Sequence, residues 1–349
     1  MDSDIEICTP PDITDAAETA SASLLPQKSK EIYECTYNKF MNWRSKNNIQ
    51  SFSENVILAY LSELAKNIKS STLWSHYSML KNTINIKNNI DIGKYPKVRA
   101  YLKRKNEGYI PKKSRILTKE QIVKFINEAP DEIFLLTKVI LLFGIAGALR
   151  RSEIYKLKIC DIEDLGNVLV VSVPDTKTKI TRKFTITEHL ELYRKYVTLR
   201  PQNYQEDKFF INYQKGKCTR QVVGINKFGK LPSEIAKFLK LPHAEEYTGH
   251  CFRRSSASLL VETGADLLML KQHGGWKSST VAEGYIENSL NKKNDISNRL
   301  LSAQNINIAS TTSTNTISKS PGKTTDVKFS NLTNCNVTIN NYNYYNGEN

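Results

Sequence analysis

The sequence predicts a mainly α-helical protein of two domains, with a small β-hairpin inside the second domain. Three observations favour this fold class. Apolar residues recur at helical spacing through most of the chain, one stretch of alternating β-branched residues interrupts them, and both ends are polar without periodicity. The chain has 349 residues, 40% of them apolar, which is enough for two domains with substantial cores.

The acidic first segment, 1–27, is predicted to be a disordered leader. It is polar and aperiodic, and the first 29 residues contain six carboxylates and one lysine. This start lacks the basic and then apolar pattern of a secretory signal, and no apolar run approaches the length of a membrane span. We therefore expect an intracellular protein whose fold begins near residue 28.

Four helical patterns predict a small all-helical domain over 28–110. They are KEIYECTYNKFMNWRSKN, SENVILAYLSELAKNI, SSTLWSHYSMLKNTINI and PKVRAYLKRKN. Ser53 is a candidate N-cap of the second helix, and Pro96 opens the fourth. The second pattern also has an apolar stripe at helical spacing, formed by Val56, Leu58, Leu61, Leu64 and Ile68.

The end of this domain and the linker that follows it, 111–115, are strongly basic. The whole chain has a net charge of +15, which suits a polyanionic partner, most simply nucleic acid. A solvated basic face is the alternative, but in so basic a chain we favour contacts to backbone phosphates. The candidate DNA-binding residues are Lys94, Lys97, Arg99, Lys103, Arg104, Lys105, Lys112, Lys113 and Arg115.

The second domain is predicted over 116–303. Thr118 and Gln121 have the spacing of a capping box, and an apolar helix follows from Asp131. The stretch NVLVVSVPDTKTKITRKFTIT alternates on either side of a polar turn, which predicts the hairpin. Helical segments are expected again from about 188 to 301. The tail, 304–349, is of low complexity and predicted to be disordered, apart from a possible terminal strand in NCNVTINNYNYY.

The cysteines favour neither disulfide bonds nor a metal site. None of them forms a CxxC pair or another metal-ligand spacing. We therefore expect reduced thiols, no metal and no cofactor. The six cysteines are Cys8, Cys35, Cys160, Cys218, Cys251 and Cys335.

Four signals in the second domain carry chemistry together, although each one alone is weak. An arginine pair closes the apolar helix in GALRRSE, and Lys177 lies in the hairpin turn. HCFRR places His250 three residues before an arginine, and HGGW is followed by a tyrosine. Singly, the charged residues would be solvated and the aromatic residues would be core.

In this order and spacing the four signals resemble the tyrosine recombinase, or phage integrase, family. Its pattern is an arginine in a T-G-L-R-x-S-E motif, a hairpin lysine, H-x-x-R, G-H or G-W, and a tyrosine nine residues later. The sequence departs from it at Gly147 and Ala148, where Thr-Gly is usual, and at Arg151, which is usually apolar. The matching residues are Arg150 with Glu153, Lys177, His250, Arg253, Trp276 and Tyr285.

The resemblance covers about residues 28 to 301 and implies a fold, a reaction and a role for each residue. The fold is a helical, SAM-like core-binding domain followed by a recombinase catalytic domain. Tyr285 would attack a DNA phosphodiester and form a 3′-phosphotyrosine, Arg150 and Arg253 would clamp the phosphate, and Lys177 would protonate the leaving 5′ oxygen. His250 and Trp276 would add hydrogen bonds, and Glu153 would orient the site. The expected partners are double-stranded DNA and three further copies in a tetramer, with no membrane.

The residues of two motifs, ALRRSE and HCFRRSSAS, and the long polar ends resemble those of recombinases from eukaryotic Crypton or DIRS-type mobile elements. This narrower resemblance implies a nuclear protein of a mobile element. Two alternatives stay open. One is a type IB topoisomerase-like enzyme, and the other is a domesticated DNA-binding regulatory protein that keeps the fold without the reaction.

Overall fold

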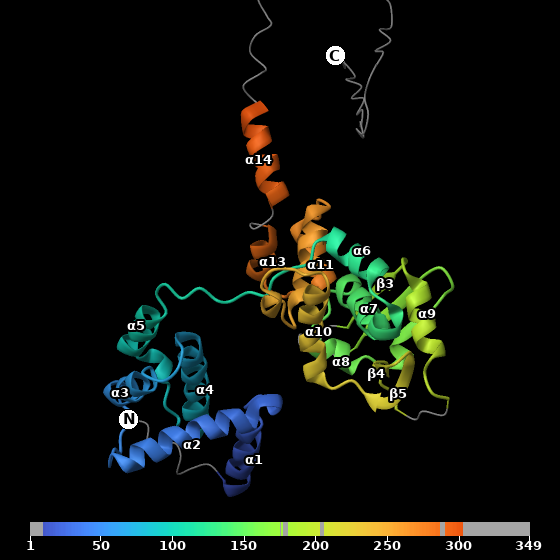
Figure 1. Ribbon diagram of the computed structural model, residues 1–349. Helices are drawn as coiled ribbons and strands as arrows, with labels where there is room; N and C mark the ends of the chain where they lie inside the picture. The colour runs from blue at the N-terminus through green and yellow to red at the C-terminus, as the bar shows by residue number, and fades with distance from the viewer. Residues whose placement is uncertain (1–9, 175, 177–180, 203–205, 287–289, 303–349) are drawn as a thin grey trace, which may run out of the picture. The chain divides into compact units, whose positions relative to one another are not determined.

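A computed structural model of the chain describes residues 10–174, 176, 181–202, 206–286 and 290–302 (Figure 1). These residues are mostly helical and form two small antiparallel sheets, which confirms the predicted fold class. The chain divides into two compact units, Met1–Arg115 with Gly229–Cys251, and Ile116–Phe228 with Phe252–Asn349. No helix in the described part of the chain is long and apolar enough to cross a membrane.

The first unit contains the four helices that the sequence predicts. Their boundaries lie within a few residues of the apolar patterns, because caps and periodicity are local signals. The helices are α2 (Lys30–Lys46), α3 (Glu54–Leu64), α4 (Ser70–Asn88) and α5 (Pro96–Lys105), with short 3₁₀ turns η2 (Gln27–Ser29), η3 (Ile92–Lys94) and η5 (Ala244–Glu246).

One apolar cluster joins these four helices. Phe40, Leu61, Leu80 and Leu102 are fully buried in it, one from each helix. The predicted stripe of α3 lies against this cluster, with Leu61 inside it and the other members partly buried. Burial of one such side chain stabilises the unit by roughly 1.5–3 kcal/mol.

The first unit differs from the sequence prediction in two places. A helix, α1 (Pro11–Ala22), forms in the segment for which we expected no fixed structure. Proline at its first position, Asp12 in its first turn and several alanines favour helix locally. Ser53 does lie at the N-cap of α3, but its side chain makes no capping bond and instead accepts a hydrogen bond from the Ser51 hydroxyl at 3.2 Å.

The second unit surrounds one buried helix, α7, with other helices and two small sheets (Figure 1). The predicted capping box opens α6, where the Thr118 hydroxyl accepts from the Gln121 N–H at 3.3 Å and the Gln121 side chain accepts from the Thr118 N–H at 3.0 Å. The helices are α6 (Lys119–Glu128), α7 (Asp131–Ala146), α8 (Arg151–Lys156), α9 (Leu190–Thr198), α10 (Ile225–Phe238), α11 (Cys251–Glu262), α12 (Leu267–Gly274), α13 (Ser279–Ile286) and α14 (Leu290–Ser302), with the 3₁₀ turn η4 (Ile159–Asp161). The boundary between the two units falls inside α10.

The predicted hairpin is present and is part of a three-stranded antiparallel sheet. β2 (Leu169–Val173) pairs with both β1 (Ile162–Asp164) and β3 (Arg182–Ile186), and Val173 lies opposite Arg182. The alternation of β2 places Leu169, Val171 and Val173 on its buried face. The turn between β2 and β3 lies almost wholly outside the described residues.

A second hairpin interrupts the region where we expected only helices. β4 (Ile211–Gln214) pairs with β5 (Lys217–Val222) across a two-residue turn. Lys215 and Gly216 in this turn both have positive φ, 48° and 76°. Positive φ at both central residues is the geometry of a type I′ hairpin turn, so the Lys-Gly pair was the sequence signal for these strands.

Two glycines of the α7 region set how closely the neighbouring elements approach the site. A Cβ on Gly144 would lie 2.8 Å from the Phe252 ring of α11. A Cβ on Gly147, just after α7, would lie 2.5 Å from the Phe184 ring of β3. Because contacts this short do not occur, the two glycines allow α11 and β3 to pack directly on the end of α7.

Candidate active site

A tight turn after α7 delivers Arg150 to the site. Ala148 is fully buried and has a φ of 44°, the left-handed conformation that normally favours glycine. The motif that the sequence resembles has glycine at this position, and here alanine adopts the left-handed conformation with its methyl group. The turn places Arg150 at the N-cap of α8, where its side chain is 17% exposed.

Glu153 holds Arg150 from the first turn of α8. Its carboxylate is 1% exposed and accepts from Arg150 Nη1 at 2.5 Å and from the Arg150 backbone N–H at 2.9 Å. Burial alone would raise the pKa of Glu153. The hydrogen bond from the Arg150 backbone and the charges of Arg182 and Arg150 outweigh burial and hold that pKa below its usual range. Glu153 is therefore an anion at neutral pH.

A further arginine, which sequence analysis missed, lies on the other side of this carboxylate. Arg182, the first residue of β3, has a side chain 8% exposed, and its Nη2 donates to Glu153 Oε2 at 2.9 Å. Its Nη1 donates to the carbonyl of His273 at 2.8 Å and to the carbonyl of Gly147. The only signal in the sequence was an arginine at the start of a predicted strand. Because this arginine follows a basic turn, its side chain was expected to be solvated.

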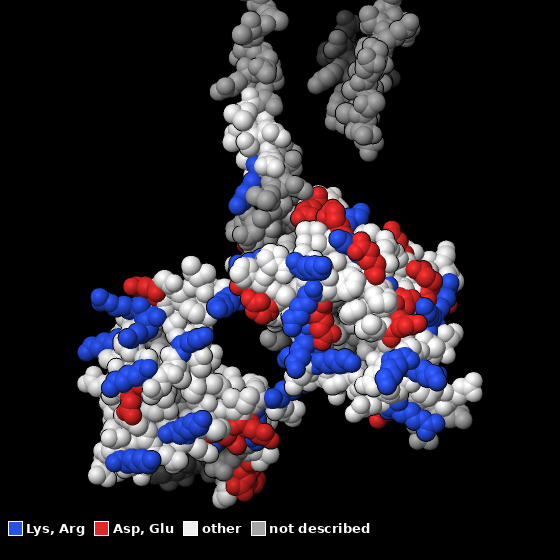
Figure 2. All heavy atoms as spheres, in the orientation of Figure 1, with Lys and Arg blue, Asp and Glu red and all other residues white. Residues whose placement is uncertain are grey.

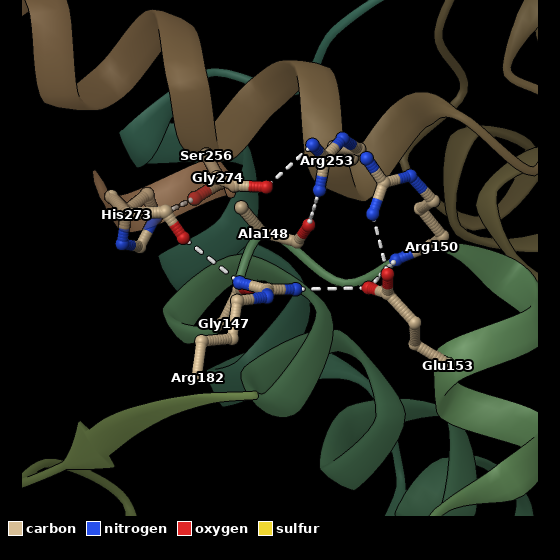
Figure 3. A network of polar contacts seen from close by, with 9 residues as sticks. All are labelled: Gly147, Ala148, Arg150, Glu153, Arg182, Arg253, Ser256, His273 and Gly274. Atoms are coloured by element: carbon tan, nitrogen blue, oxygen red, sulfur yellow. Dashed lines mark hydrogen bonds and ion pairs between the residues drawn. The ribbon is translucent and has the colours of Figure 1, made fainter. Parts of the chain in front are cut away.

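Arg253 extends from the first turn of α11 into the same cluster (Figure 3). Its Nη1 and Nη2 donate to the carbonyls of Ala148 and Gly274, both at 2.6 Å. Burial and the like charge of Arg150 lower the pKa of Arg253 to about 9, which leaves it charged at neutral pH. Figure 3 shows the guanidinium groups of Arg150 and Arg253 facing the same space.

Trp276 and Tyr285 form the aromatic side of the site. The Arg253 guanidinium lies 4.3 Å from the centre of the Trp276 ring, a cation–π contact. The ring centres of Trp276 and Tyr285 are 5.4 Å apart, and Tyr285 is close enough to Arg253 to interact with its charge. α12 ends at Gly274, where a Cβ would collide with the Trp276 ring at 1.9 Å.

His273 and Ser256 support the same corner and were also missed by sequence analysis. His273 Nε2 and the Ser256 hydroxyl are 2.7 Å apart. Burial, with the charges of Arg182 and Arg253, lowers the pKa of His273 to about 4, so this imidazole is neutral at neutral pH. A histidine two residues before a Gly-Trp pair was the signal available in the sequence.

The remaining predicted site residues lie away from the arginine cluster or outside the residues that the structure describes. Lys177 lies outside the described residues, so its role stays a prediction. His250 is exposed and directly precedes α11. The nine basic residues from Lys94 to Arg115 are all exposed, and Arg115 pairs with Glu246 at 2.6 Å. On the face seen in Figure 2, the part of the first unit formed by α2–α5 carries many basic and few acidic side chains.

The assembled cluster is suited to binding an oxyanion. Arg150 and Arg182 bind the carboxylate of Glu153, and Arg253 lies in the same cluster, which leaves an excess of two positive charges. Arginine donors in a fixed fork match phosphate oxygens, and a low-dielectric setting strengthens each contact. Within the described parts of the chain, no group of three or more His, Cys, Asp or Glu residues could hold a metal ion.

Comparison with known proteins places this chain in a family. A sequence profile of the phage integrase family matches residues 115–292. The tyrosine recombinase XerC of Rickettsia bellii (strain OSU 85-389) is 25% identical over 189 residues, which are 52% of this chain and 59% of that protein. XerC of Rickettsia prowazekii (strain Madrid E) is 25% identical over 250 residues, 71% of this chain and 74% of the relative. The match thus spans about 59% of the length of the first relative.

Solved structures share the fold at low sequence identity. The XerH site-specific recombinase bound to palindromic difH substrate aligns with a TM-score of 0.60 at 18% identity, covering 78% of this chain and 80% of that chain. The Tn1549 transposon integrase in complex with transposon right end DNA aligns with a TM-score of 0.54 at 16% identity, covering 81% of this chain and 99% of that chain.

Proposed function

Because this chain belongs to the phage integrase family, we propose that it cleaves and rejoins double-stranded DNA through a 3′-phosphotyrosine intermediate. The observation that carries the proposal is the arginine cluster around Glu153 beside Tyr285. Relatives that are tyrosine recombinases, and a structural neighbour bound to transposon DNA, support the same substrate and reaction.

In this reaction Arg150 and Arg253 bind the non-bridging oxygens of the scissile phosphate. Negative charge builds on these oxygens during attack, and preorganised donors stabilise it by roughly 3–4 kcal/mol each. The Tyr285 hydroxyl loses its proton to solvent as its oxygen attacks phosphorus, and the bond to the 5′ oxygen breaks. Lys177 gives that oxygen its proton, while His250 and Trp276 add hydrogen bonds to the phosphate. Since the phosphotyrosine keeps the energy of the broken bond, rejoining needs no ATP.

The test replaces only the attacking oxygen. Tyr285→Phe is expected to abolish the covalent protein–DNA adduct and to leave DNA affinity within about 2-fold, because the ring and its packing against Trp276 remain. A suicide substrate traps the adduct, which is read as a shifted band on a denaturing gel. Adduct formation should persist in EDTA, because the proposed mechanism uses only side chains.

Matched variants of the arginine pair show whether the site itself does the chemistry. Arg150→Ala should lower both cleavage and affinity, whereas Arg151→Ala, at an exposed position, should change cleavage little. An adduct that persists in Tyr285→Phe would place the nucleophile elsewhere. A wild-type chain that binds DNA and forms no adduct on sites recovered from a randomised duplex library would favour the domesticated binding protein.

We propose further that four copies assemble on two DNA sites through α14. This helix carries three large apolar side chains that are mostly exposed, Ile296 (58%), Leu300 (70%) and Leu301 (67%). Lys293 lies on the same helix. A groove of about 520 Å³ on the second unit offers a complementary surface for the α14 of another copy. Its lining combines apolar residues with three glutamates and one lysine, among them Ile122, Ile126, Leu142, Glu120, Glu188, Glu262 and Lys119.

The assembly is tested by measuring the mass of the DNA-bound complex by light scattering. Leu300→Glu with Leu301→Glu is expected to reduce the tetramer to smaller species, because it places carboxylates against an acidic groove. Asn298→Glu, an exposed polar position on α14, is the control. A wild-type chain that stays monomeric on two-site DNA would contradict the assembly.

We also propose that the chain acts in the nucleus as the recombinase of a eukaryotic Crypton- or DIRS-like mobile element. The residues of the ALRRSE and HCFRRSSAS motifs and the long polar ends support this narrower assignment. Imaging of a fluorescent fusion in a eukaryotic cell tests the location, and cytoplasmic retention of the fusion would count against it.

A further inference from the structure

Arg182 is connected to both arginines that the reaction uses. On one side it shares the Glu153 carboxylate with Arg150, since Arg150 Nη1 donates to Oε1 and Arg182 Nη2 donates to Oε2. On the other side it binds the carbonyls that directly precede those held by Arg253. Arg182 donates hydrogen bonds to the carbonyls of Gly147 and His273. Arg253 donates to the carbonyls of Ala148 and Gly274 (Figure 3).

Arg182 differs from Arg253 in its partners rather than in its burial. Both side chains are buried, but Arg182 Nη2 pairs with the Glu153 carboxylate and its Nη1 donates to two carbonyls, whereas Arg253 donates to two carbonyls. The Nε atom of Arg182 is buried without a hydrogen-bond partner. A buried guanidinium without full compensation is costly, so the fold must gain something specific from keeping it there.

The charge balance indicates what is gained. Without Arg182, Glu153 would form a closed pair with Arg150 alone, and the pair would be nearly neutral toward a bound phosphate. With Arg182 present, the carboxylate is balanced by a cation that is not available to the substrate. The charges of Arg150 and Arg253 then both remain for the phosphate.

We propose that Arg182 is a positioning residue that neutralises Glu153, so that Arg150 keeps its net charge for the scissile phosphate. This inference rests on the proposed DNA-cleavage function. Arg182 acts through Glu153 on Arg150, and through consecutive carbonyls of two turns on the orientation of Arg253. It transfers no proton and does not touch the reacting atoms.

The experiment measures single-turnover adduct formation on a suicide substrate at saturating protein, with DNA affinity measured separately in the Tyr285→Phe background. Arg182→Gln should slow adduct formation by roughly 100-fold, the scale of losing one preorganised donor, and change affinity by less than about 3-fold. Arg182→Lys keeps the cation and should be at least about 10-fold faster than Arg182→Gln.

A second substitution separates charge from mere structural support. In the Arg182→Gln background, Glu153→Gln removes the anion that Arg182 neutralised, and the excess of two positive charges returns. We expect this double variant to recover about 10-fold in rate, which is a strongly non-additive result for residues in contact. A structural brace would give the opposite result, since removing a second hydrogen-bonding group would slow the reaction further.

Each outcome bears on the inference. A double variant no faster than Arg182→Gln, or an Arg182→Lys variant as slow as Arg182→Gln, overturns it. If Arg182→Gln does not unfold cooperatively in a thermal melt, the inference is decided by the rate of adduct formation of Arg182→Lys compared with that of wild type. A wild-type chain without an adduct counts against the proposed function, whereas an active wild type with an equally fast Arg182→Gln counts against this inference alone.

Discussion

At the scale of single residues, the site depends on backbone carbonyls as much as on side chains. Arg253 is 4% exposed, and two carbonyls on different turns fix its guanidinium group. Carbonyl dipoles let a cation stay buried without a carboxylate of its own, so Arg253 keeps its charge for a ligand. The orientation of this arginine therefore depends on the shape of the turns at Ala148 and Gly274.

Gly274 is the residue where this dependence is easiest to test. In Gly274→Ala the new Cβ would lie 1.9 Å from the Trp276 ring, so the ring must move away from Arg253 and Tyr285. We expect adduct formation to fall roughly 10- to 100-fold, because a phosphate donor and the face that supports Arg253 are displaced together. Gly224→Ala, where a Cβ meets nothing within 4 Å, is the control. Unchanged kinetics in Gly274→Ala would show that the ring position is unimportant.

His273 predicts how stability depends on pH. Burial lowers its folded-state pKa from 6.5 to about 4, so between these values the unfolded chain binds a proton that the folded chain does not. Its contribution to the unfolding free energy is complete above about pH 6.5 and is lost as pH falls toward 4. His273→Asn should flatten this part of the profile in chemical denaturation at several pH values. His243→Asn, at a side chain 61% exposed, is the control, and equal slopes in the two variants would contradict the assignment.

At the scale of elements, local caps define the helices and close packing defines the site. The capping box of α6 forms as its sequence predicts, whereas α3 has a serine at the N-cap whose hydroxyl bonds to another serine. The same residue class thus makes different contributions to stability at two helix starts. The difference lies in the hydrogen-bond partner that each hydroxyl meets, which the sequence pattern does not specify.

The two caps provide a matched pair of variants. Thr118→Ala should lower the unfolding free energy of the second unit by about 1 kcal/mol, because an N–H of α6 loses its acceptor. Ser53→Ala should cost only a few tenths of that, since no cap bond is removed. Native-state hydrogen exchange of the amides in α6 and α3 measures both effects. A larger effect for Ser53→Ala would contradict the assigned caps.

At the scale of the whole molecule, charge dominates the expected encounter with DNA. The net charge is +15, and all nine basic residues from Lys94 to Arg115 are exposed. Each neutralised phosphate releases counterions, so affinity falls with salt in proportion to the number of phosphates that the protein neutralises. Affinity and cleavage are therefore expected to respond to different residues, the exposed cations and the buried arginines.

Salt titration of the full chain tests this separation. Replacing Lys103, Arg104 and Lys105 with alanine should reduce the slope of log affinity against log salt by ~0.9 for each phosphate that the variant no longer neutralises. Lys124→Ala, at a cation that lies 4.0 Å from Glu128, is the control and should leave the slope nearly unchanged. A slope that stays the same in the triple variant would mean that DNA binds away from α5.

The sequence by itself predicted the four helices of the first unit, the first hairpin and part of the site. Helical periodicity and the Thr118–Gln121 capping box are local signals, so they can be read from neighbouring residues alone. The resemblance of these motifs to the tyrosine recombinase family predicted a site shared by Arg150, Glu153, Arg253, Trp276 and Tyr285, and the fold brings these five residues together. Lys177 and the long tail stay predictions, because they lie outside the described residues.

Only the tertiary structure decided the positions of Arg182 and His273. Arg182 is 29 residues from Glu153 and 91 from His273 along the chain, and no periodicity links such positions. A strand arginine after a basic turn has the same sequence pattern whether its guanidinium is solvated or buried. Which of the two occurs depends on the close approach of β3, α7 and α12, and this packing is a property of the folded chain.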